Sequence, residues 1–479
     1  MRSLVHTSRR LIISRPKTRS SFRILYFRAR FLSSSSGWID ESFDLPIGNN
    51  GSISLSLTRP VASNLPTQSH SRSQGPNVIL YLRPGPLFQG HAYPVPEGDE
   101  PHDLSLDNLK WAANGTNHGG LSPQQSLASM TSATVVTVNY RLGAVSPPPR
   151  SNEETIQNST HTSPNASPSS LSQPQSQPLF YKYPTPIHDT LAAFDWIKTN
   201  LNPAHLGVIG SHIGGSLALM LALTEAQSVK AVASIMPVTD WVGLDDYCTT
   251  EQANANTSEK PTSKRASKKK NIRATAPRDI VPLLAAREAL FSSPERCFDA
   301  FASPILFLRS AGRDVPSAFP VYLARPEYPV PVLKNTRPAD LDGSFSNQEN
   351  DLEDDELSET GHTTVRRRKA LSRWPPYGLD YGAGGRGWGG NGVRRLEVTL
   401  PWVRVYVEGN EGESSETVLA DQGEEMVSVM RRACFFGREK GFGERRVSLV
   451  RGVGEVGLGV GEEVGGWFER IFDGRISDE

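Results

Sequence analysis

The chain has 479 residues, and its 51 lysines and arginines balance 51 aspartates and glutamates. A formal net charge of zero gives no electrostatic reason to expect a nucleic-acid partner. Hydrophobic residues make up only 37% while glycine and proline are plentiful, so we expect one large domain whose core is interrupted by polar inserts.

The cysteines are too few and too scattered for a disulfide framework. Cys248, Cys297 and Cys434 are far apart and odd in number, which predicts three reduced thiols and no metal site. No uninterrupted apolar run reaches the roughly 18 residues that a membrane span needs. The sequence thus predicts no metal, no cofactor and no transmembrane segment.

The N-terminal segment has an unusual composition. Basic residues and serines are frequent before Asp40, and no acidic residue occurs there. Such a composition is typical of a mitochondrial transit peptide, whereas a secretory signal needs a longer apolar stretch. We therefore assign residues 1–39 to a transit peptide or an unstructured tail, and predict a mitochondrial location with a cytoplasmic one as the alternative.

From residue 40 onward, strand patterns alternate with helix patterns. Apolar and β-branched runs predict strands at 53–57, 77–82, 133–140, 206–209, 229–236, 403–407 and 446–450. Apolar residues at helical spacing predict helices at 187–201, 214–225 and 420–438, and a closing helix around Trp467. This order predicts an α/β fold with a mainly parallel sheet and helices on both faces.

Polar stretches interrupt this pattern. We assign residues 40–479 to one domain with flexible inserts at 145–178, 251–277 and 338–393. The first is rich in Ser, Pro, Gln and Asn, the second is lysine-rich, and the third passes from an acidic run to a Gly-rich end. The lysine-rich insert predicts a solvated loop or an anion-binding or nuclear-localisation patch, and the Gly-rich end leaves RNA contact as a weaker alternative.

Residues 207–219 have the outline of a nucleophile elbow, the strained strand-to-helix turn with the pattern G-x-S-x-G. Gly210, Gly214 and Gly215 set the register, because a tight turn against a helix needs residues without side chains. That register places His212 at the position of the serine.

With these elements in view, the chain resembles the α/β-hydrolase fold, specifically the esterase/lipase group related to hormone-sensitive lipase. Segments similar to those of the group occur in its order: Val138-Asn139-Tyr140-Arg141-Leu142, Tyr183-Pro184, Ser303-Pro304-Ile305 and Leu400-Pro401. The resemblance implies a site built from a serine, a histidine base, an acid and backbone donors for an oxyanion.

The first parts of that site depart from the group. His212 replaces the serine, and an imidazole offers no acyl intermediate as stable as an ester. The oxyanion loop reads Arg83-Pro84-Gly85-Pro86 where the group has H-G-G-G, so two prolines remove two N–H donors. The positions that would line a ligand pocket there are Arg83, Gly85, Ser211, Ile213 and Gly214.

The remaining parts are an acid and a base. We place the acid at Glu411, just after the strand at 403–407, and a rival alignment places it at Asp314. The histidine should follow the last strand, but no histidine occurs after His362. Replacements are poor: Ser211 precedes the corner, Ser216 lies inside the helix, and His188 with Asp189 suits a helix start.

Two hypotheses from different classes follow. The first is a pseudo-hydrolase that lacks Ser-His-acid catalysis and binds a small acyl-like ligand or a protein partner. The second is an active hydrolase on esters or amides that uses non-standard residues, with His212 as acid or base beside Glu411. Loss of the nucleophile or the base alone costs about a million-fold in turnover, which favours the first hypothesis.

Overall fold

The computed structural model describes thirteen stretches of the chain. They are residues 30–32, 37–61, 75–85, 122–145, 179–250, 276–323, 330–333, 367–372, 374–375, 399–409, 416–435, 439–452 and 460–476. The greater part of each predicted insert lies outside these stretches; the inserts are 145–178, 251–277 and 338–393.

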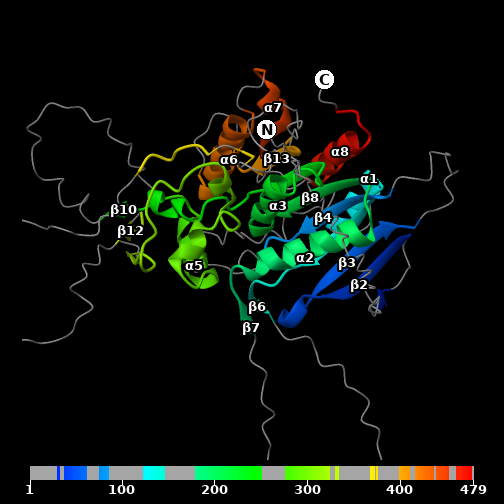
Figure 1. The fold of residues 1–479 in the computed structure, drawn as a ribbon, viewed down its shortest axis with the longest axis horizontal. Helices are drawn as coiled ribbons and strands as arrows, with labels where there is room; N and C mark the ends of the chain where they lie inside the picture. Colours follow the sequence, from blue (N-terminus) through cyan, green and yellow to red (C-terminus); the bar gives the residue numbers. More distant parts are fainter. Residues whose placement is uncertain are drawn as a thin grey trace, which may run out of the picture.

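A nine-stranded sheet runs through the centre of the molecule (Figure 1). In spatial order its strands are β1 (Arg30–Leu32), β2 (Trp38–Pro46), β3 (Ser52–Pro60), β5 (Thr134–Asn139), β4 (Asn77–Leu82), β8 (His205–Ser211), β9 (Ala231–Ile235), β13 (Trp402–Val407) and β14 (Val447–Arg451). The strands from β5 to β14 are parallel, and β1, β2 and β3 pair antiparallel at one side. The predicted mainly parallel sheet is confirmed.

Helices cover the sheet on both faces. In chain order they are α1 (Pro123–Thr131), α2 (Thr185–Asn200), α3 (Ile213–Thr224), α5 (Ile280–Leu290), α6 (Val418–Cys434), α7 (Phe442–Arg446) and α8 (Val460–Phe472). Successive residues of β13 contact helices on opposite faces of the sheet. The Arg404 guanidinium lies 5.0 Å from the centre of the Trp467 ring of α8, whereas Val405 packs towards Gly423 of α6 on the other face. Helix α1 packs beside α8.

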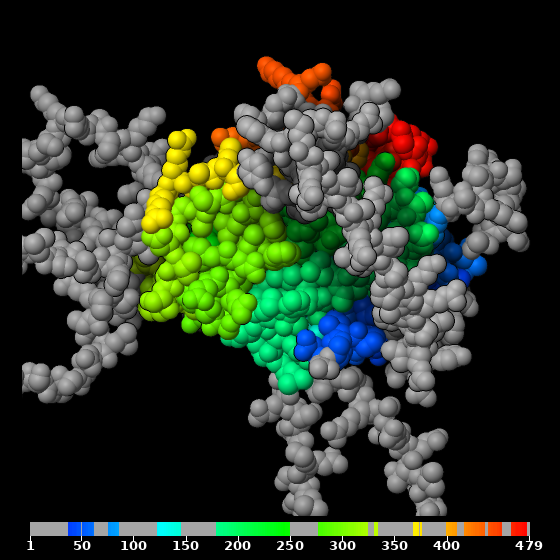
Figure 2. Space-filling model, in the orientation of Figure 1, coloured from blue at the N-terminus to red at the C-terminus, as the bar shows by residue number. Residues whose placement is uncertain are grey.

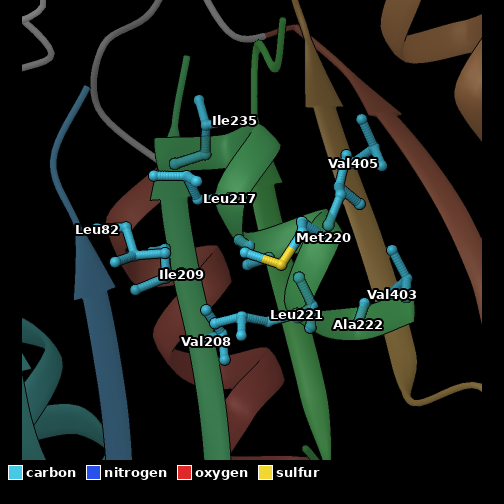
Figure 3. Packing of buried hydrophobic residues seen from close by; sticks show 14 of the residues in the cluster. Leu82, Val208, Ile209, Leu217, Met220, Leu221, Ala222, Ile235, Val403 and Val405 are labelled. Atoms are coloured by element: carbon cyan, nitrogen blue, oxygen red, sulfur yellow. The ribbon is translucent and has the colours of Figure 1, made fainter. Parts of the chain in front are cut away.

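Apolar side chains fill the space between α3 and the sheet (Figure 3). Leu217, Met220 and Leu221 of α3 meet the strands through Val208 and Val405. All residues of α3 from Ile213 to Leu223 are buried, so this helix is hydrophobic all round rather than amphipathic. The helix that begins at the elbow is therefore one of the most firmly packed elements.

Several short elements complete the described fold. Two small sheets are formed by β6 (Gly143–Val145) with β7 (Leu179–Tyr181), and by β10 (Thr249–Thr250), β12 (Val332–Leu333) and β11 (Tyr322–Leu323). Single 3₁₀ turns occur at η1 (Gly48–Asn50), η4 (Gly243–Tyr247), η6 (Pro294–Phe298) and η7 (Pro304–Phe307). None of these elements was predicted.

Two predicted boundaries differ from the structure. Strand β1 begins at Arg30 and β2 at Trp38, so the sheet starts inside the segment 1–39 that we assigned to a transit peptide or tail. Within the predicted insert 338–393, residues 367–372 lie along residues 308–312 (Figure 2) and Trp374 is buried. Part of this segment therefore belongs to the packed domain.

Two general features of the described residues bear on function. None of their helices is both long and apolar enough to cross a bilayer. Within the same stretches no cluster of three or more histidine, cysteine or acidic side chains could ligate a metal, and the three cysteines are free thiols.

Candidate functional site

The turn between β8 and α3 forms a sharp corner with His212 at its tip. His212 has φ 50° and ψ −111°, a left-handed conformation that is strained for a residue with a side chain. The His212 N–H donates to the carbonyl of Ile235 (2.9 Å), and its own carbonyl accepts from the N–H groups of Ser216 (3.0 Å) and Val238 (3.3 Å). These bonds hold the strained corner in place.

The glycines around the corner are required by close backbone approach. A Cβ on Gly210 would come closer than 3.0 Å to the carbonyl of Gly214, and one on Gly214 closer than 3.0 Å to the carbonyls of Leu82 and Arg83. Because these neighbours are backbone atoms, they cannot turn aside as a side chain would. The corner therefore has the construction of a nucleophile elbow.

The imidazole of His212 is buried, with only 6% of the residue exposed. Burial lowers the pKa of His212 to about 3, because the charged form loses its hydration. The ring is consequently neutral at pH 7. A general base works best with a pKa near the operating pH, so this imidazole is a weak base.

The two serines beside the corner are placed differently from a nucleophile. Ser211 is the last residue of β8 and is 8% exposed. The Ser216 hydroxyl lies 3.1 Å from the carbonyl oxygen of His212 and also bonds the carbonyl of Val238. Ser216 thus ties the first turn of α3 to the corner, in agreement with its predicted packing role.

The predicted oxyanion loop lies against the elbow. Gly85 has φ 92°, and a Cβ on it would stand 3.3 Å from the Tyr140 hydroxyl and 3.5 Å from Ile213 Cδ1. The structure therefore brings Arg83, Gly85, Ile213 and Gly214 together. Pro84 offers no N–H, the Arg83 side chain is exposed, and Pro86 lies outside the described stretches.

Tyr140 is part of this site and was given no role from the sequence. Its hydroxyl donates a 2.6 Å hydrogen bond to the carbonyl of Arg83. Burial raises the pKa of Tyr140 well above its usual value, so the phenol keeps its proton and remains a donor. Its position in Val138–Leu142, the segment that carried the resemblance, was the available signal.

The match to a known family agrees with this geometry. Residues 179–315, which contain the elbow and α3, match a family model described as alpha/beta hydrolase fold. The chain has an α/β-hydrolase fold. No curated protein matches it in sequence.

Solved structures with a similar fold include esterases of the group that the sequence resembles. Carboxyl esterase 2 from the mycorrhizal fungus Tuber melanosporum is 13% identical, with a TM-score of 0.40, 91% of this chain covered and 89% of that one. An esterase/lipase from an uncultured bacterium is 12% identical, with a TM-score of 0.37 and coverages of 92% and 88%. Brefeldin A esterase, a bacterial homologue of human hormone sensitive lipase, is 12% identical, with a TM-score of 0.36 and coverages of 93% and 76%.

The predicted acid position follows strand β13. This strand lies beside β9 in the sheet and ends at Val407, so its carboxyl end reaches the same edge as the elbow. Glu408 follows and forms an ion pair with Arg278. Glu411, the predicted acid, lies outside the described residues.

The rival acid has a different position. Asp314 follows the 3₁₀ turn η7 rather than a strand of the sheet. Its exposed carboxylate is 3.3 Å from the guanidinium of Arg367. The alignment through β13 therefore fits the sheet better than the alignment through Asp314.

The base of an α/β-hydrolase would follow β14. That strand ends at Arg451, and residues 453–459 before α8 are outside the described stretches and contain no histidine. Of the other described histidines, His188 is exposed and His205 begins β8 at the opposite end of the sheet. Asp189 pairs with Arg141, at 2.7 Å, rather than with His188.

Proposed function

We propose that this α/β-hydrolase-fold protein is a pseudo-hydrolase, which binds a small acyl-like ligand or a protein partner instead of hydrolysing esters by Ser-His-acid chemistry. The observation that supports it best is the buried imidazole of His212 at the tip of the elbow. A hydroxyl at this corner would form the acyl-enzyme. The neutral ring at this corner offers no such intermediate.

Under this proposal the chain lacks both the nucleophilic serine and the histidine base, and each loss lowers the rate of ester hydrolysis. Loss of the nucleophile or the base alone costs about a million-fold in turnover, which is about 8 kcal/mol of transition-state stabilisation. The prolines beside Gly85 also remove oxyanion donors, and such donors supply much of the residual rate when the triad is broken. Binding is the part of the family's chemistry that needs none of these groups.

The alternative is an active hydrolase that uses His212 as acid or base with Glu411. A pKa of about 3 argues against it, because an imidazole that is neutral at pH 7 holds no proton to donate and accepts one only weakly. This alternative would need a conformation in which His212 becomes solvated.

Labelling with a fluorophosphonate probe separates the two candidates. We expect no covalent labelling of the purified chain and no hydrolysis of p-nitrophenyl esters above the buffer rate. The variant His212→Ser should also lack esterase turnover, because it restores a hydroxyl without a base, and His188→Ser is the matched exposed control. Labelling of the wild-type chain at a mapped serine, or robust turnover by His212→Ser, would overturn the proposal.

We also propose that the protein is imported into mitochondria, on the basis of its basic, acid-free N-terminal segment. Fluorescence microscopy of a reporter fused to residues 1–39 tests this, with a control in which the arginines before Arg30 are replaced by glutamine. A cytoplasmic signal from the unaltered fusion would contradict it.

A further inference from the structure

A basic surface feature lies where α6 leads through α7 into β14. It consists of residues 431–435 and 439–446, which we call the knob. Helix α7 packs on the last turn of α6, since a Cβ on Gly443 would stand 3.4 Å from the Phe435 ring and 3.5 Å from Arg431 Cβ. Figure 1 places α7 at the margin of the molecule, and no described heavy atom lies within 4 Å of a Cβ built on Gly441. The turn before α7 therefore points into open space.

The knob presents more cations than acids to solvent. Its exposed or half-buried charged side chains are Arg431, Arg432, Lys440, Arg445, Glu439 and Glu444. The acids of the preceding turns of α6, Glu424 and Glu425, form ion pairs with Arg451 and Arg309. No ion pair with a described residue engages Lys440 or Arg445. The knob therefore carries an excess of positive charge that is open to an anionic partner.

Helix stability explains only part of this charge. Cations in the last turn of a helix interact favourably with its dipole, which accounts for Arg431 and Arg432 at the end of α6. The Nε of Arg431 also donates to the carbonyl of Val447 (2.9 Å). Lys440 lies beyond α6, and Arg445 belongs to the five-residue α7, which is too short for a large dipole. The charges of Lys440 and Arg445 therefore have no structural task in the described fold.

An aromatic ring lies among these cations. Phe442 is half-buried, its ring centre is 5.4 Å from that of Phe435, and the Arg445 guanidinium lies 5.9 Å from it. An aromatic ring flanked by lysine and arginine is typical of surfaces that contact the headgroup region of a bilayer. Nucleic-acid bases stack on open ring faces, but Arg445 already covers one face of Phe442 and Phe435 packs against the ring. A lipid surface therefore fits the knob better than RNA.

We propose that the knob docks the protein on an anionic phospholipid surface. Arg432, Lys440 and Arg445 attract the headgroups, and Phe442 lies at headgroup level. Val447, which follows the knob, pairs with Val403 near the amino end of β13, so the knob lies at the end of the sheet opposite the elbow. The proposal is thus independent of the pseudo-hydrolase proposal, and its test measures membrane binding rather than labelling or turnover.

Co-sedimentation of the full chain with large vesicles tests the proposal. We expect binding to phosphatidylcholine vesicles that contain about 30 mol% phosphatidylserine, at least about tenfold weaker binding to pure phosphatidylcholine, and loss of binding as salt is added. Absence of binding to the anionic vesicles overturns the proposal. Equal binding to both kinds of vesicle removes the role of the cations and also overturns it.

Variants assign the binding to the knob, because the basic N-terminal segment and the lysine-rich insert could also attract anionic lipid. Lys440→Gln combined with Arg445→Gln should weaken vesicle binding about tenfold or more, since each cation near such a surface contributes about fivefold. Both side chains are exposed, so the variant keeps the fold. Unchanged binding in this variant overturns the proposal.

The matched control removes two exposed cations elsewhere. Lys198→Gln combined with Arg368→Gln, on α2 and in the segment 367–372, should leave vesicle binding within about twofold of wild type. An equal loss in this control would mean that only net charge matters, which overturns the role of the knob. Knob-dependent retention on single-stranded RNA, with no binding to anionic vesicles, would assign the knob to nucleic acid and overturn the proposal.

Discussion

The α-carbon of Gly214 lies so close to the carbonyl oxygen of Leu82 that an added Cβ would come nearer than 3.0 Å to it. This contact joins the first turn of α3 to the end of β4, and both sides of it are backbone. The variant Gly214→Ala should therefore lower the free energy of unfolding by about 1–3 kcal/mol, the usual range for overpacking a tight site. Urea denaturation followed by circular dichroism measures the change.

Gly466 provides a matched control for Gly214. It is also a helical glycine, in α8, but no heavy atom lies within 4 Å of a Cβ built on it. Gly466→Ala should raise the free energy of unfolding by roughly 0.5–1 kcal/mol, because alanine favours the helix. If Gly214→Ala were as stable as Gly466→Ala, the close approach at the elbow would be wrong.

The buried imidazole of His212 makes stability depend on pH. Its folded-state pKa of about 3 lies below its ordinary value of 6.5, so the unfolded chain binds the extra proton between these values. The free energy of unfolding should therefore fall as pH drops below about 6.5, by about 2–3 kcal/mol between pH 7 and pH 4.5 from this group alone. His212→Asn removes that dependence and suits a positive φ.

The test is urea denaturation of both proteins across this pH range. The wild-type curve should fall more steeply than that of His212→Asn below pH 6.5, and the two slopes should agree above pH 7. His188→Asn, at an exposed histidine, controls for the loss of one imidazole elsewhere in the chain. Parallel curves for wild type and His212→Asn throughout would show that the imidazole is hydrated in the folded state.

The elbow was predictable from local sequence because its constraint is local. Gly210, Gly214 and Gly215 sit where any side chain would meet backbone or the Ser234 hydroxyl, so the spacing alone located the corner and its occupant. The burial of His212 was not predictable, since it depends on elements far along the chain. The role of Tyr140 was missed for the same reason, because its partner Arg83 is 57 positions away.

Elements outside the α/β alternation were harder to predict. Strand β2 has intermediate burial along most of its length, so its apolar alternation is weak. Helix α5 contains Pro282, which interrupts a helical pattern. Residues 367–372 are polar and basic, typical of a surface loop, yet Lys369 reaches Asp246 at 3.1 Å and so secures the segment. An ion pair between residues 123 positions apart produces no periodic pattern in the sequence, so this contact could not be predicted.

Arg141 and Asp189 form a buried ion pair that should be sensitive to loss of one partner. The Asp189 side chain is fully buried, and it accepts from the Arg141 guanidinium (2.7 Å and 3.0 Å) and from the Arg141 N–H (2.8 Å). Asp189→Asn leaves the buried guanidinium without a counter-charge, so it should cost about 3–5 kcal/mol of unfolding free energy. Chemical denaturation at pH 7 measures this loss.

The exposed pair of Arg59 and Glu41 supplies the comparison. Its atoms are equally close, at 2.7 Å, but the Arg59 side chain is 47% exposed. Glu41→Gln should cost less than about 1 kcal/mol, because solvent screens the charges. Similar losses in Asp189→Asn and Glu41→Gln would mean that the Asp189 pair is hydrated.

Residues 367–372, which we call the strap, are held to the domain by backbone hydrogen bonds, and the buried Trp374 follows them. Arg367 N–H donates to Gly312 (2.7 Å), Ser310 N–H to Ala370 (2.8 Å) and Ser372 N–H to Leu308 (2.8 Å). Two residues later, the indole of Trp374 is buried and donates to the carbonyl of Leu223 at the end of α3 (3.1 Å).

Trp374→Ala should release the strap. Removal of a buried tryptophan side chain lowers the free energy of unfolding by about 3–5 kcal/mol. The other hydrogen bonds of the strap lie near the surface, so they hold it less firmly. Trypsin should then cut after Arg367, Arg368 or Lys369, whereas the backbone bonds protect these sites in the wild-type chain. Leu371→Ala, at a 41% exposed position of the same strap, should leave the cleavage pattern unchanged. Mass spectrometry of timed digests identifies the sites, and equal resistance in Trp374→Ala would refute the role of Trp374 as anchor.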